Sequence, residues 1–435
     1  MRNMDILGRL IIGTVNLFFA CTWACAQPAY TVLNANHYNL TVKHARAKVQ
    51  TLLKELSSQR QLSLDEQVAF ITEKLADIPY FYAGAMGEGD WQPNALSYQP
   101  GAVQINQHPV YRMDGMDCQT LTQMVMALLL SNDLDQFDTH MVKIAYGAFQ
   151  KRWGNRVDFY NRNHFIEGDF NRVNQERGWL KDVTSHGPLA PYASTTSILL
   201  SRYQWFLWQQ QHAVQVLDAK TGQAMVKRMK TQLADLTEPR ARLEKITLTY
   251  LPKTGLALPN PDGTYRANTT LLARIPTPAL AEIVYDTKQW RVQRKNIKDV
   301  IGTELAIAHL GILYRQTFHQ GELIYHRIRC AWHAKQHTTL CQVKPIFCDH
   351  PQCPTLMFAH ATYAYPKQYY WYQQKGRYVC TSHLPSQVLR YSSCNRVERL
   401  PLFDYLTDFQ YGSYWYMNWP AIAGIHIEKL SLYSD

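Results

Sequence analysis

Beyond its first thirty residues, the chain lacks any apolar run long enough to span a bilayer, which excludes a polytopic membrane protein. It also lacks long Lys/Arg runs, internal repeats and Gly/Ser linkers, so nothing indicates a nucleic-acid-binding tail or a repeat array. Three catalytic signatures are missing as well: the phosphate-binding G-x-x-x-x-G-K-[ST], the zinc-binding H-E-x-x-H and the serine elbow G-x-S-x-G. The chemistry must therefore come from other residues.

What is present indicates a folded protein with a sizeable core, because 46% of the 435 residues are hydrophobic and 12% aromatic. The first segment carries two arginines, an apolar stretch from Leu10 to about Cys21, and the small residues Ala24-Cys25-Ala26. This pattern predicts a secretory signal peptide over residues 1–26 and a secreted or periplasmic mature protein. An uncleaved membrane anchor is the alternative, disfavoured because the apolar stretch is short and interrupted.

The predicted signal peptide contains two arginines and one aspartate, so its removal lowers the formal net charge of +11 by only one. A positive protein outside the cytoplasm meets acidic wall polymers or carboxylate-bearing peptides rather than nucleic acid. The basic residues are dispersed, which is typical of a solvated surface with mild electrostatic steering.

Cysteine usage separates one residue from the rest. Seven of the nine cysteines lie outside the predicted signal peptide, and six of these seven fall within residues 330–394. In an oxidising compartment those six are disulfide candidates, with up to three bonds and fifteen ways of pairing: Cys330, Cys341, Cys348, Cys353, Cys380 and Cys394. Cys118 stands alone, so it is the first candidate nucleophile; a buried core cysteine is the alternative.

The sequence around Cys118 predicts that it begins a helix. Gly115 and Asp117 interrupt the preceding segment, and apolar residues then recur at helical spacing to about Leu130. Unpaired amides at a helix start stabilise a thiolate, so we expect a thiol pKa lowered toward neutrality and a site that binds an oxyanion.

A thiol nucleophile needs a base, and two predicted strands offer histidines. Residues 305–314 and 321–328 resemble buried strands joined by a hairpin with its turn at about 315–320. That register places His309 opposite His326, close enough for one imidazole to orient the other. A slip of one residue would put the two histidines on opposite faces of the sheet.

These residues occur together with a series of further motifs. They are Gly87-Glu88-Gly89, residues 109–114, Asp117-Cys118-Gln119-Thr120, Arg162-Asn163-His164-Phe165, Asn174, Gly178, Asp182-Val183-Thr184, Ala308-His309-Leu310-Gly311-Ile312, residues 321–326, residues 400–406 and Gly424-Ile425-His426-Ile427. In this order they resemble the N-acetylmuramoyl-L-alanine amidase-like family, a branch of the NlpC-type, papain-fold cell-wall hydrolases. The resemblance covers roughly residues 75–327 and 395–430.

The resemblance implies an α+β papain-like fold with helical additions. It implies Cys118 as nucleophile, His309 as base and His326 as the third, orienting residue. His164 occupies a position that the family places near the substrate cleft, although a role in tying its segment to the core is equally open. The same motifs make four further residues substrate-binding candidates: Tyr111, Asp117, Arg162 and Asn163. The chain departs from the family pattern at Met116 and Phe170, near the cleft.

The implied reaction is hydrolysis of an amide bond in peptidoglycan or muropeptides, without a cofactor or metal. The resemblance favours the bond between muramic acid and L-alanine. A stem-peptide endopeptidase of the same fold, or a non-catalytic wall-binding protein, is the alternative. The sequence leaves the oligomeric state open.

Domain organisation follows from the same motifs. Residues 27–78 are expected to form helices, residues 79–326 and 396–435 the catalytic domain, and residues 327–395 an inserted, disulfide-stapled subdomain. Residues 196–235 are also expected to be helical. The insertion offers two alternative roles. Its histidines and cysteines, including His333 and His337, could bind zinc, and its tyrosines and Trp371 could bind glycan or simply pack around the disulfides.

Overall fold

The structure is a computed structural model of the whole chain. It describes residues 31–76, 78–81, 86–89, 105–209, 214–292, 294–333, 338–361, 370–374, 377–381, 392–393, 396–410 and 413–432. The predicted signal peptide lies outside these residues. Among them, no helix combines the length and the apolar character that crossing a membrane requires.

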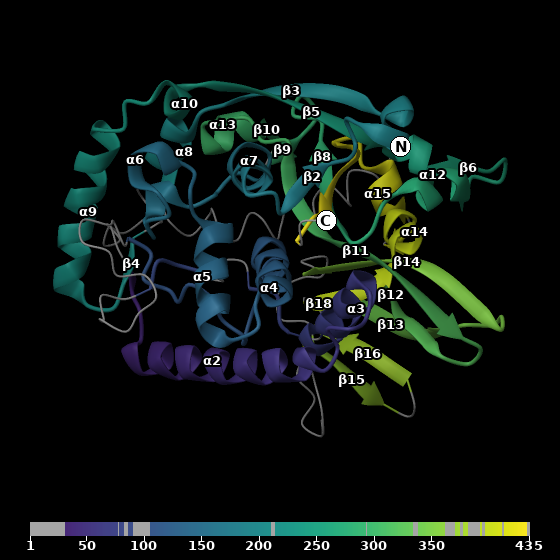
Figure 1. The fold of residues 1–435 in the computed structure, drawn as a ribbon. Coiled ribbons are helices and arrows are strands. Elements are labelled where there is room, and N and C mark those ends of the chain that lie inside the picture. The colour runs from purple at the N-terminus through teal and green to yellow at the C-terminus, as the bar shows by residue number, and fades with distance from the viewer. Residues whose placement is uncertain are drawn as a thin grey trace.

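The fold is a mixed α/β architecture built on one mostly antiparallel sheet of eight strands (Figure 1). Seven strands follow the order β18-β14-β11-β8-β21-β5-β3, and β2 pairs with β21. Their bounds are Val397–Pro401 (β18), Gln352–Ala361 (β14), Ile307–His319 (β11), Ala279–Tyr285 (β8), Ile422–Leu430 (β21), Glu244–Pro252 (β5), Ser194–Leu200 (β3) and Leu180–Asp182 (β2).

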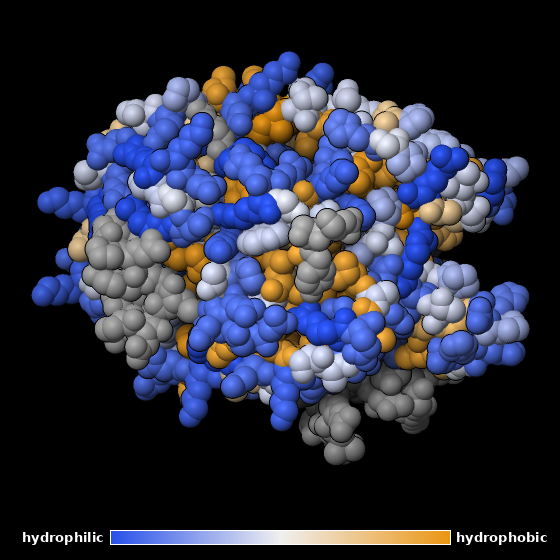
Figure 2. All heavy atoms as spheres, viewed as in Figure 1, coloured by the Kyte–Doolittle hydropathy of each residue, from blue (hydrophilic) through white to orange (hydrophobic). Residues whose placement is uncertain are grey.

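Helices cover one face of this sheet. They are α2 (Ala35–Ser57), α3 (Leu64–Leu75), α4 (Cys118–Leu130) and α5 (Leu134–Ala145). Nearly every side chain of α4 is buried, because this helix is apolar all round and lies inside the helical layer. Figure 2 shows polar side chains over most of the viewed face, with hydrophobic ones visible near its centre. Helices α2 and α3 lie within residues 27–78, so the helices predicted for this N-terminal segment are confirmed.

Residues 196–235 are only partly helical, so that prediction is wrong for its first five residues. Residues 194–200 form β3, which pairs with β5 through its whole length. Helices α8 (Arg202–Gln209) and α9 (Ala219–Ala234) follow. Pairing with β5 overrides the local helical pattern, as tertiary context often does.

Strand β11 is hydrogen-bonded along both edges, to β8 and to β14. A glycine allows the second contact: a Cβ on Gly311 would lie 2.5 Å from the carbonyl oxygen of Ala359 in β14. The chain turns at Gly321, whose φ of 83° is in the left-handed region that glycine favours. Strand β12 (Leu323–His333) then leaves the main sheet instead of pairing back on β11.

The second sheet contains five strands in the order β12-β13-β16-β15-β17 and lies beside the body of the molecule (Figure 1). Its other strands are β13 (Thr338–Phe347), β16 (Arg377–Thr381), β15 (Tyr370–Gln374) and β17 (Ser392–Ser393). Most of the described residues of the predicted insertion lie in this sheet. The boundary at 327–395 is nevertheless wrong for residues 352–361, because these form β14, which lies between β18 and β11 in the main sheet.

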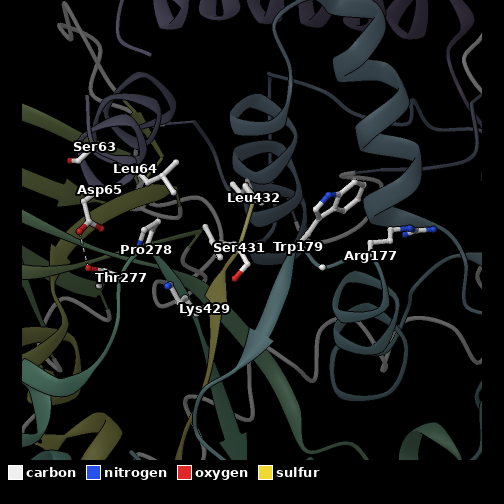
Figure 3. Close-up of a pocket in the computed structure, with 12 residues that line it drawn as sticks. Ser63, Leu64, Asp65, Arg177, Trp179, Thr277, Pro278, Lys429, Ser431 and Leu432 are labelled. Carbon is white, nitrogen blue, oxygen red and sulfur yellow. Dashed lines mark hydrogen bonds between the residues drawn. The ribbon is translucent and has the colours of Figure 1, made fainter. Parts of the chain in front are cut away.

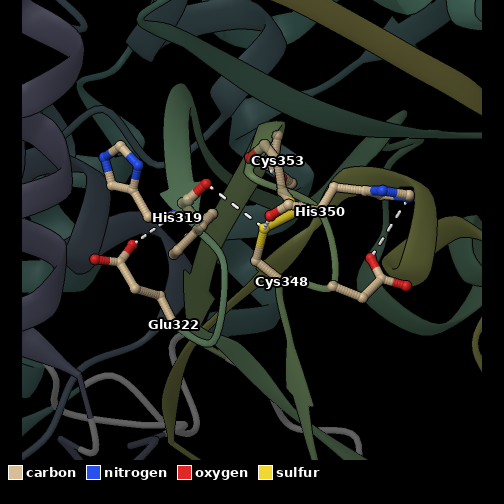
Figure 4. Close-up of a disulfide and its surroundings, with 8 residues drawn as sticks. His319, Glu322, Cys348, His350 and Cys353 are labelled. Atoms are coloured by element: carbon tan, nitrogen blue, oxygen red, sulfur yellow. Dashed lines mark hydrogen bonds and ion pairs between the residues drawn. A yellow bond between two sulfur atoms is a disulfide. The ribbon is translucent and has the colours of Figure 1, made fainter.

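One disulfide, between Cys348 and Cys353, joins the end of the second sheet to the start of β14 (Figure 4). It confirms the disulfide prediction for that pair. In backbone register Cys341 lies opposite Cys330 on one side and Cys380 on the other, while Cys394 falls outside the described residues.

A polar cluster is buried within the main sheet. Glu282 of β8 lies opposite His426 of β21, and His426 Nε2 is 2.9 Å from Glu428 Oε1. Asn171 donates to Glu282 Oε2 at 2.9 Å. Burial raises the pKa of Glu282 to about 8. Burial alone would lower the pKa of His426, but Glu428 and Glu282 outweigh it and raise that pKa to about 9.

Both shifts make the folded protein lose stability as the pH rises. A carboxyl with a raised pKa and an imidazole with a raised pKa each bind a proton more tightly in the folded state. Glu282 therefore contributes fully to the stability of the fold below about pH 5, and His426 does so below about pH 6.5. We expect the free energy of unfolding in urea to fall by a few kcal/mol, on the order of 3 to 5, between pH 6 and pH 9. Glu282→Gln should make the decline shallower; an unchanged slope in that variant would contradict this prediction.

Candidate active site

Cys118 is the first residue of α4, as the sequence predicts; the residue is half-buried as a whole, and its thiol is free. The residue before it caps the helix. Asp117 Oδ1 accepts a hydrogen bond from the Thr120 amide at 2.7 Å, and Thr120 Oγ1 accepts one from the Asp117 amide at 2.9 Å. This capping box fixes the entry to the helix, so the backbone of Cys118 is held at the positive end of α4.

A short segment, residues 78–81, connects this helix start to the edge strand β18. The Phe81 amide donates to the Met116 carbonyl at 2.9 Å, two residues before Cys118. The Val397 amide donates to the Ile78 carbonyl at 2.8 Å, at the first residue of β18. The segment therefore holds the start of α4, with Cys118, and the start of β18 in one region of the molecule.

Burial raises the pKa of the Cys118 thiol to about 12, and the negative charge of Asp117 acts in the same direction. The backbone amides of Leu310, Gln119 and Cys118 itself act in the opposite direction. The expectation of a thiol pKa near neutrality is therefore wrong: desolvation outweighs the field of the first helical turn. Cys118 is a neutral thiol in the resting protein.

The same amide contact locates the sulfur. Leu310 follows His309 in β11, so the Cys118 Sγ lies beside the strand that carries the predicted base. The register of β11 shifts between Ile307 and His309, a bulge of the kind that redirects side chains near active sites. The structure thus places the Cys118 thiol at the backbone next to His309.

His309 is paired with a second histidine. Its Nε2 lies 3.0 Å from Nδ1 of His360, a residue of β14 that is only 2% exposed. His360 Nε2 in turn lies 3.3 Å from Glu398 Oε1 on β18, an electrostatic contact without the angles of a hydrogen bond. Glu398 favours a proton on His360 Nε2, so His360 Nδ1 accepts and His309 Nε2 donates. His309 Nδ1 then retains the lone pair that a thiol proton needs.

Burial lowers the pKa of His309 well below its usual value, and His360 adds to the effect. His309 is therefore neutral at neutral pH. These residues therefore start as a neutral thiol, which lies at the Leu310 amide next to His309, and a neutral imidazole.

Aromatic rings hold the two histidines in place. The Tyr405 ring of α14 (Leu402–Leu406) stacks on His309 at 6.3 Å between centroids and meets His360 edge-on at 5.0 Å. Phe358 stacks on His360 at 4.8 Å with an interplanar angle of 16°. These contacts restrict both imidazoles, because aromatic pairs favour such offset and edge-to-face arrangements.

The prediction that His326 lies opposite His309 is wrong. His326 lies on β12, opposite Pro345 of β13, whereas β11 has β8 and β14 as its neighbours. The hairpin model fails because β11 continues to His319, beyond the predicted turn, and both of its edges are already paired. His360 occupies the place that the sequence assigned to His326.

Three of the predicted substrate-binding residues support the site from inside the protein. The Gln119 side chain donates to the Asn163 carbonyl at 2.8 Å, and Asn163 Nδ2 donates to the Ile144 carbonyl at 2.9 Å. Arg162 forms an ion pair with the buried Glu88. The Asn163 contact braces the first turn of α4, and Asp117 caps that turn.

The other two candidates are also engaged within the protein. The His164 ring packs among Phe159, Trp205 and Phe206, and its Nε2 lies 2.6 Å from the Phe159 carbonyl oxygen. Burial lowers the pKa of His164 to about 3. These contacts favour the alternative in which His164 anchors its segment to the hydrophobic core. Tyr111 donates to Asp138 at 2.8 Å. Direct substrate contact by these five residues stays a prediction.

The zinc alternative loses two of its candidate ligands, because Cys348 and Cys353 are bonded to each other. Within the part of the chain that the structure describes, no group of three or more His, Cys, Asp or Glu side chains converges as a metal site. His337 lies outside that part.

A pocket of about 750 Å³ opens at the other end of β8 (Figure 3). Asp65, Arg177 and Lys429 contribute its charged groups, and Thr277 donates to Asp65 at 2.8 Å. The lining includes Thr277 and Pro278, which precede β8, whereas Cys118 and His309 are absent from it. This pocket is separate from the candidate active site.

Sequence reasoning missed His360, Glu398 and Tyr405. A signal for His360 was available, because it interrupts the apolar run Met357-Phe358-Ala359, which is typical of a buried strand. Glu398 and Tyr405 carry no such local signal.

Comparisons with known proteins identify the family and the fold. The model of the AmiA-like family, described as N-acetylmuramoyl-L-alanine amidase-like, matches residues 90–328. The chain belongs to this amidase-like family. The match includes Cys118 and His309 and ends before His360 and Glu398. Membership supports a cell-wall hydrolase that acts on an amide bond of peptidoglycan. No curated protein matches the chain.

A solved structure shows that the amidase-like chain shares its fold. It is the crystal structure of protein LPG0564 from Legionella pneumophila strain Philadelphia 1, assigned to the family DUF1460. The TM-score is 0.59 at 22% sequence identity, and the alignment covers 91% of this chain and 97% of the other. The likeness at this identity concerns the fold alone.

The histidine pairing predicts different outcomes for two substitutions. His360→Ala removes the acceptor for His309 Nε2–H, so we expect kcat to fall roughly a hundredfold, with partial recovery in His360→Gln. His326→Ala should keep kcat within about threefold of the native value. Steady-state kinetics on muropeptides would measure both. A large loss in His326→Ala with little loss in His360→Ala would restore the hairpin model.

The raised thiol pKa predicts slow alkylation. At pH 7.5 we expect iodoacetamide to modify Cys118 at least about tenfold more slowly than free cysteine, with the rate still rising above pH 9. Mass spectrometry of the peptide containing Cys118 gives the rate, and the urea-unfolded protein is the control because unfolding removes the burial. If the folded protein is modified as fast as free cysteine, the thiol pKa of Cys118 is not raised.

Proposed function

We propose that this chain is a cysteine hydrolase that cleaves the amide bond between muramic acid and L-alanine in peptidoglycan or muropeptides. The observation that carries the proposal is the position of the free Cys118 thiol, at a helix start and at the Leu310 amide of β11. The residue before Leu310 is His309, which is hydrogen-bonded to His360. Family membership supplies the substrate class.

The arrangement supports a papain-like catalytic order, with a nucleophile on a helix and a base on the neighbouring sheet. Cys118 attacks the carbonyl carbon while its proton passes to His309 Nδ1. Because both groups start neutral, proton transfer accompanies the attack instead of preceding it. His360 accepts from His309 Nε2–H and stabilises the imidazolium, and Glu398 favours the required tautomer.

The rest of the reaction uses the same groups. The amides of Cys118 and Gln119 lie at the sulfur and stabilise the oxyanion of the tetrahedral intermediate. The imidazolium of His309 protonates the departing amine of L-alanine as the C–N bond breaks. Water then hydrolyses the thioester, with His309 as its base, and restores the thiol.

Export is part of the proposal. A signal peptide over residues 1–26 would deliver the protein to the compartment that contains its substrate, and the Cys348–Cys353 disulfide fits an oxidising environment.

Digestion of purified murein tests enzyme class and bond together. We expect the native protein to release stem peptides with a free L-alanine amino group, and Cys118→Ala and Cys118→Ser to lose at least about a thousandfold in rate. Mass spectrometry identifies the products. Truncated peptides would establish a stem endopeptidase instead. If neither the native protein nor Cys118→Ala releases products and both bind murein equally, the chain is a wall-binding protein.

A further inference from the structure

A row of aromatic rings extends away from His309 along the catalytic end of the sheet. Tyr405 stacks on His309, and the Tyr416 ring lies 5.6 Å from Tyr405 between centroids. Tyr416 also lies near Tyr285: burial raises the pKa of Tyr416, and the charge of Tyr285 raises it further. Tyr285 then meets two tryptophans. Trp290 stacks on it at 4.5 Å with an interplanar angle of 25°, and Trp419 meets it edge-on at 5.8 Å.

The inner part of this row borders the nucleophile. Besides burial, the charge of Cys118 raises the pKa of both Tyr285 and Tyr405, so both hydroxyls lie within electrostatic reach of the sulfur. The backbone agrees, because the Tyr285 amide donates at 2.7 Å to the carbonyl of Ala306, three residues before His309. The row therefore begins where the carbonyl of a substrate must lie.

The outer part of the row is accessible. Tyr285 and Tyr416 are buried, whereas the two tryptophans are only partly buried. One face of Trp290 rests on Tyr285, and within the described part of the chain its ring makes no other aromatic or cation contact. Trp290 is therefore a half-buried ring, supported on one face by Tyr285, at the outer end of the row.

The turn that carries this ring also contains polar groups. Trp290 donates its amide to the Asp286 carbonyl at 2.9 Å, which holds it in the turn after β8. The Asp286 carboxylate lies in the same turn and accepts from the Lys288 amide and from the Gln289 side chain. A flat aromatic face beside carboxylate and amide groups suits a pyranose ring, whose C–H face is apolar and whose hydroxyls need hydrogen-bond partners.

We propose that Trp290, supported by Tyr285 and flanked by Trp419, is the subsite that binds the sugar ring on the acyl side of the scissile bond. The ligand is the pyranose of an N-acetylmuramoyl group, and the inference rests on the proposed amidase function. In that substrate the sugar is joined through its lactyl group to the carbonyl that Cys118 attacks. A stem endopeptidase has an amino acid at that place and needs no such subsite.

Two substrates with the same stem peptide test the subsite. One carries an N-acetylmuramoyl group on L-alanine, and the other carries only a lactoyl group. For Trp290→Leu we expect kcat/KM to fall about tenfold on the muramoyl peptide, the size of one lost stacking contact. On the lactoyl peptide kcat/KM should stay within about twofold, and Trp290→Phe should lose less on the muramoyl peptide. Equal losses on both substrates, or none on either, would overturn the subsite.

A control variant and a binding measurement separate this inference from the proposed function. Trp153→Leu changes a tryptophan of a different core, packed on Phe149, and should affect neither substrate. In the Cys118→Ala background, binding of the methyl glycoside of N-acetylmuramic acid is followed by isothermal titration calorimetry. Binding that is weakened about tenfold by Trp290→Leu supports the subsite even if the native protein hydrolyses nothing. Hydrolysis of the muramoyl amide together with unchanged glycoside binding in Trp290→Leu retains the function and rejects the subsite.

Discussion

The pairing of β11 with β14 determines the geometry of the candidate site. Because β11 is hydrogen-bonded on both edges, its position relative to the helical layer is fixed, and with it the Leu310 amide beside Cys118. The same pairing brings His360 to His309, and the next strand, β18, brings Glu398. Three adjacent strands of one sheet thus supply the polar groups behind the nucleophile, which limits the motion that each can have.

Burial explains the electrostatic state of these groups. The cost of desolvation raises the thiol pKa and lowers that of His309, so charge separation is unfavourable until a substrate arrives. A site of this kind protects a reactive thiol from oxidation in an oxidising compartment. In the proposed mechanism charge develops only during the reaction, and the helix amides and the second imidazole are already in place to stabilise it. The proposed sugar subsite fits the same picture, because a sugar that covers the cleft would exclude water further.

The predictions from sequence were most reliable where the signal was local. The polar residues before Cys118 and the apolar spacing after it placed the helix start correctly, because capping and helical periodicity depend on neighbouring residues. The strand of His309 and the closing strand around His426 were also confirmed. The hairpin failed for a reason that local sequence does not contain: the partner of β11 comes from beyond β12 and β13.

The sequence by itself determined the unpaired cysteine, the helix that begins with it, the strand that carries His309 and the family to which the chain is similar. Only the tertiary structure decided that His360 and not His326 contacts His309, and that the resting thiol is neutral. The physical reason is the same in both cases. Strand pairing between distant segments and the loss of water around a side chain depend on the whole packed sheet, and no window of neighbouring residues carries that information.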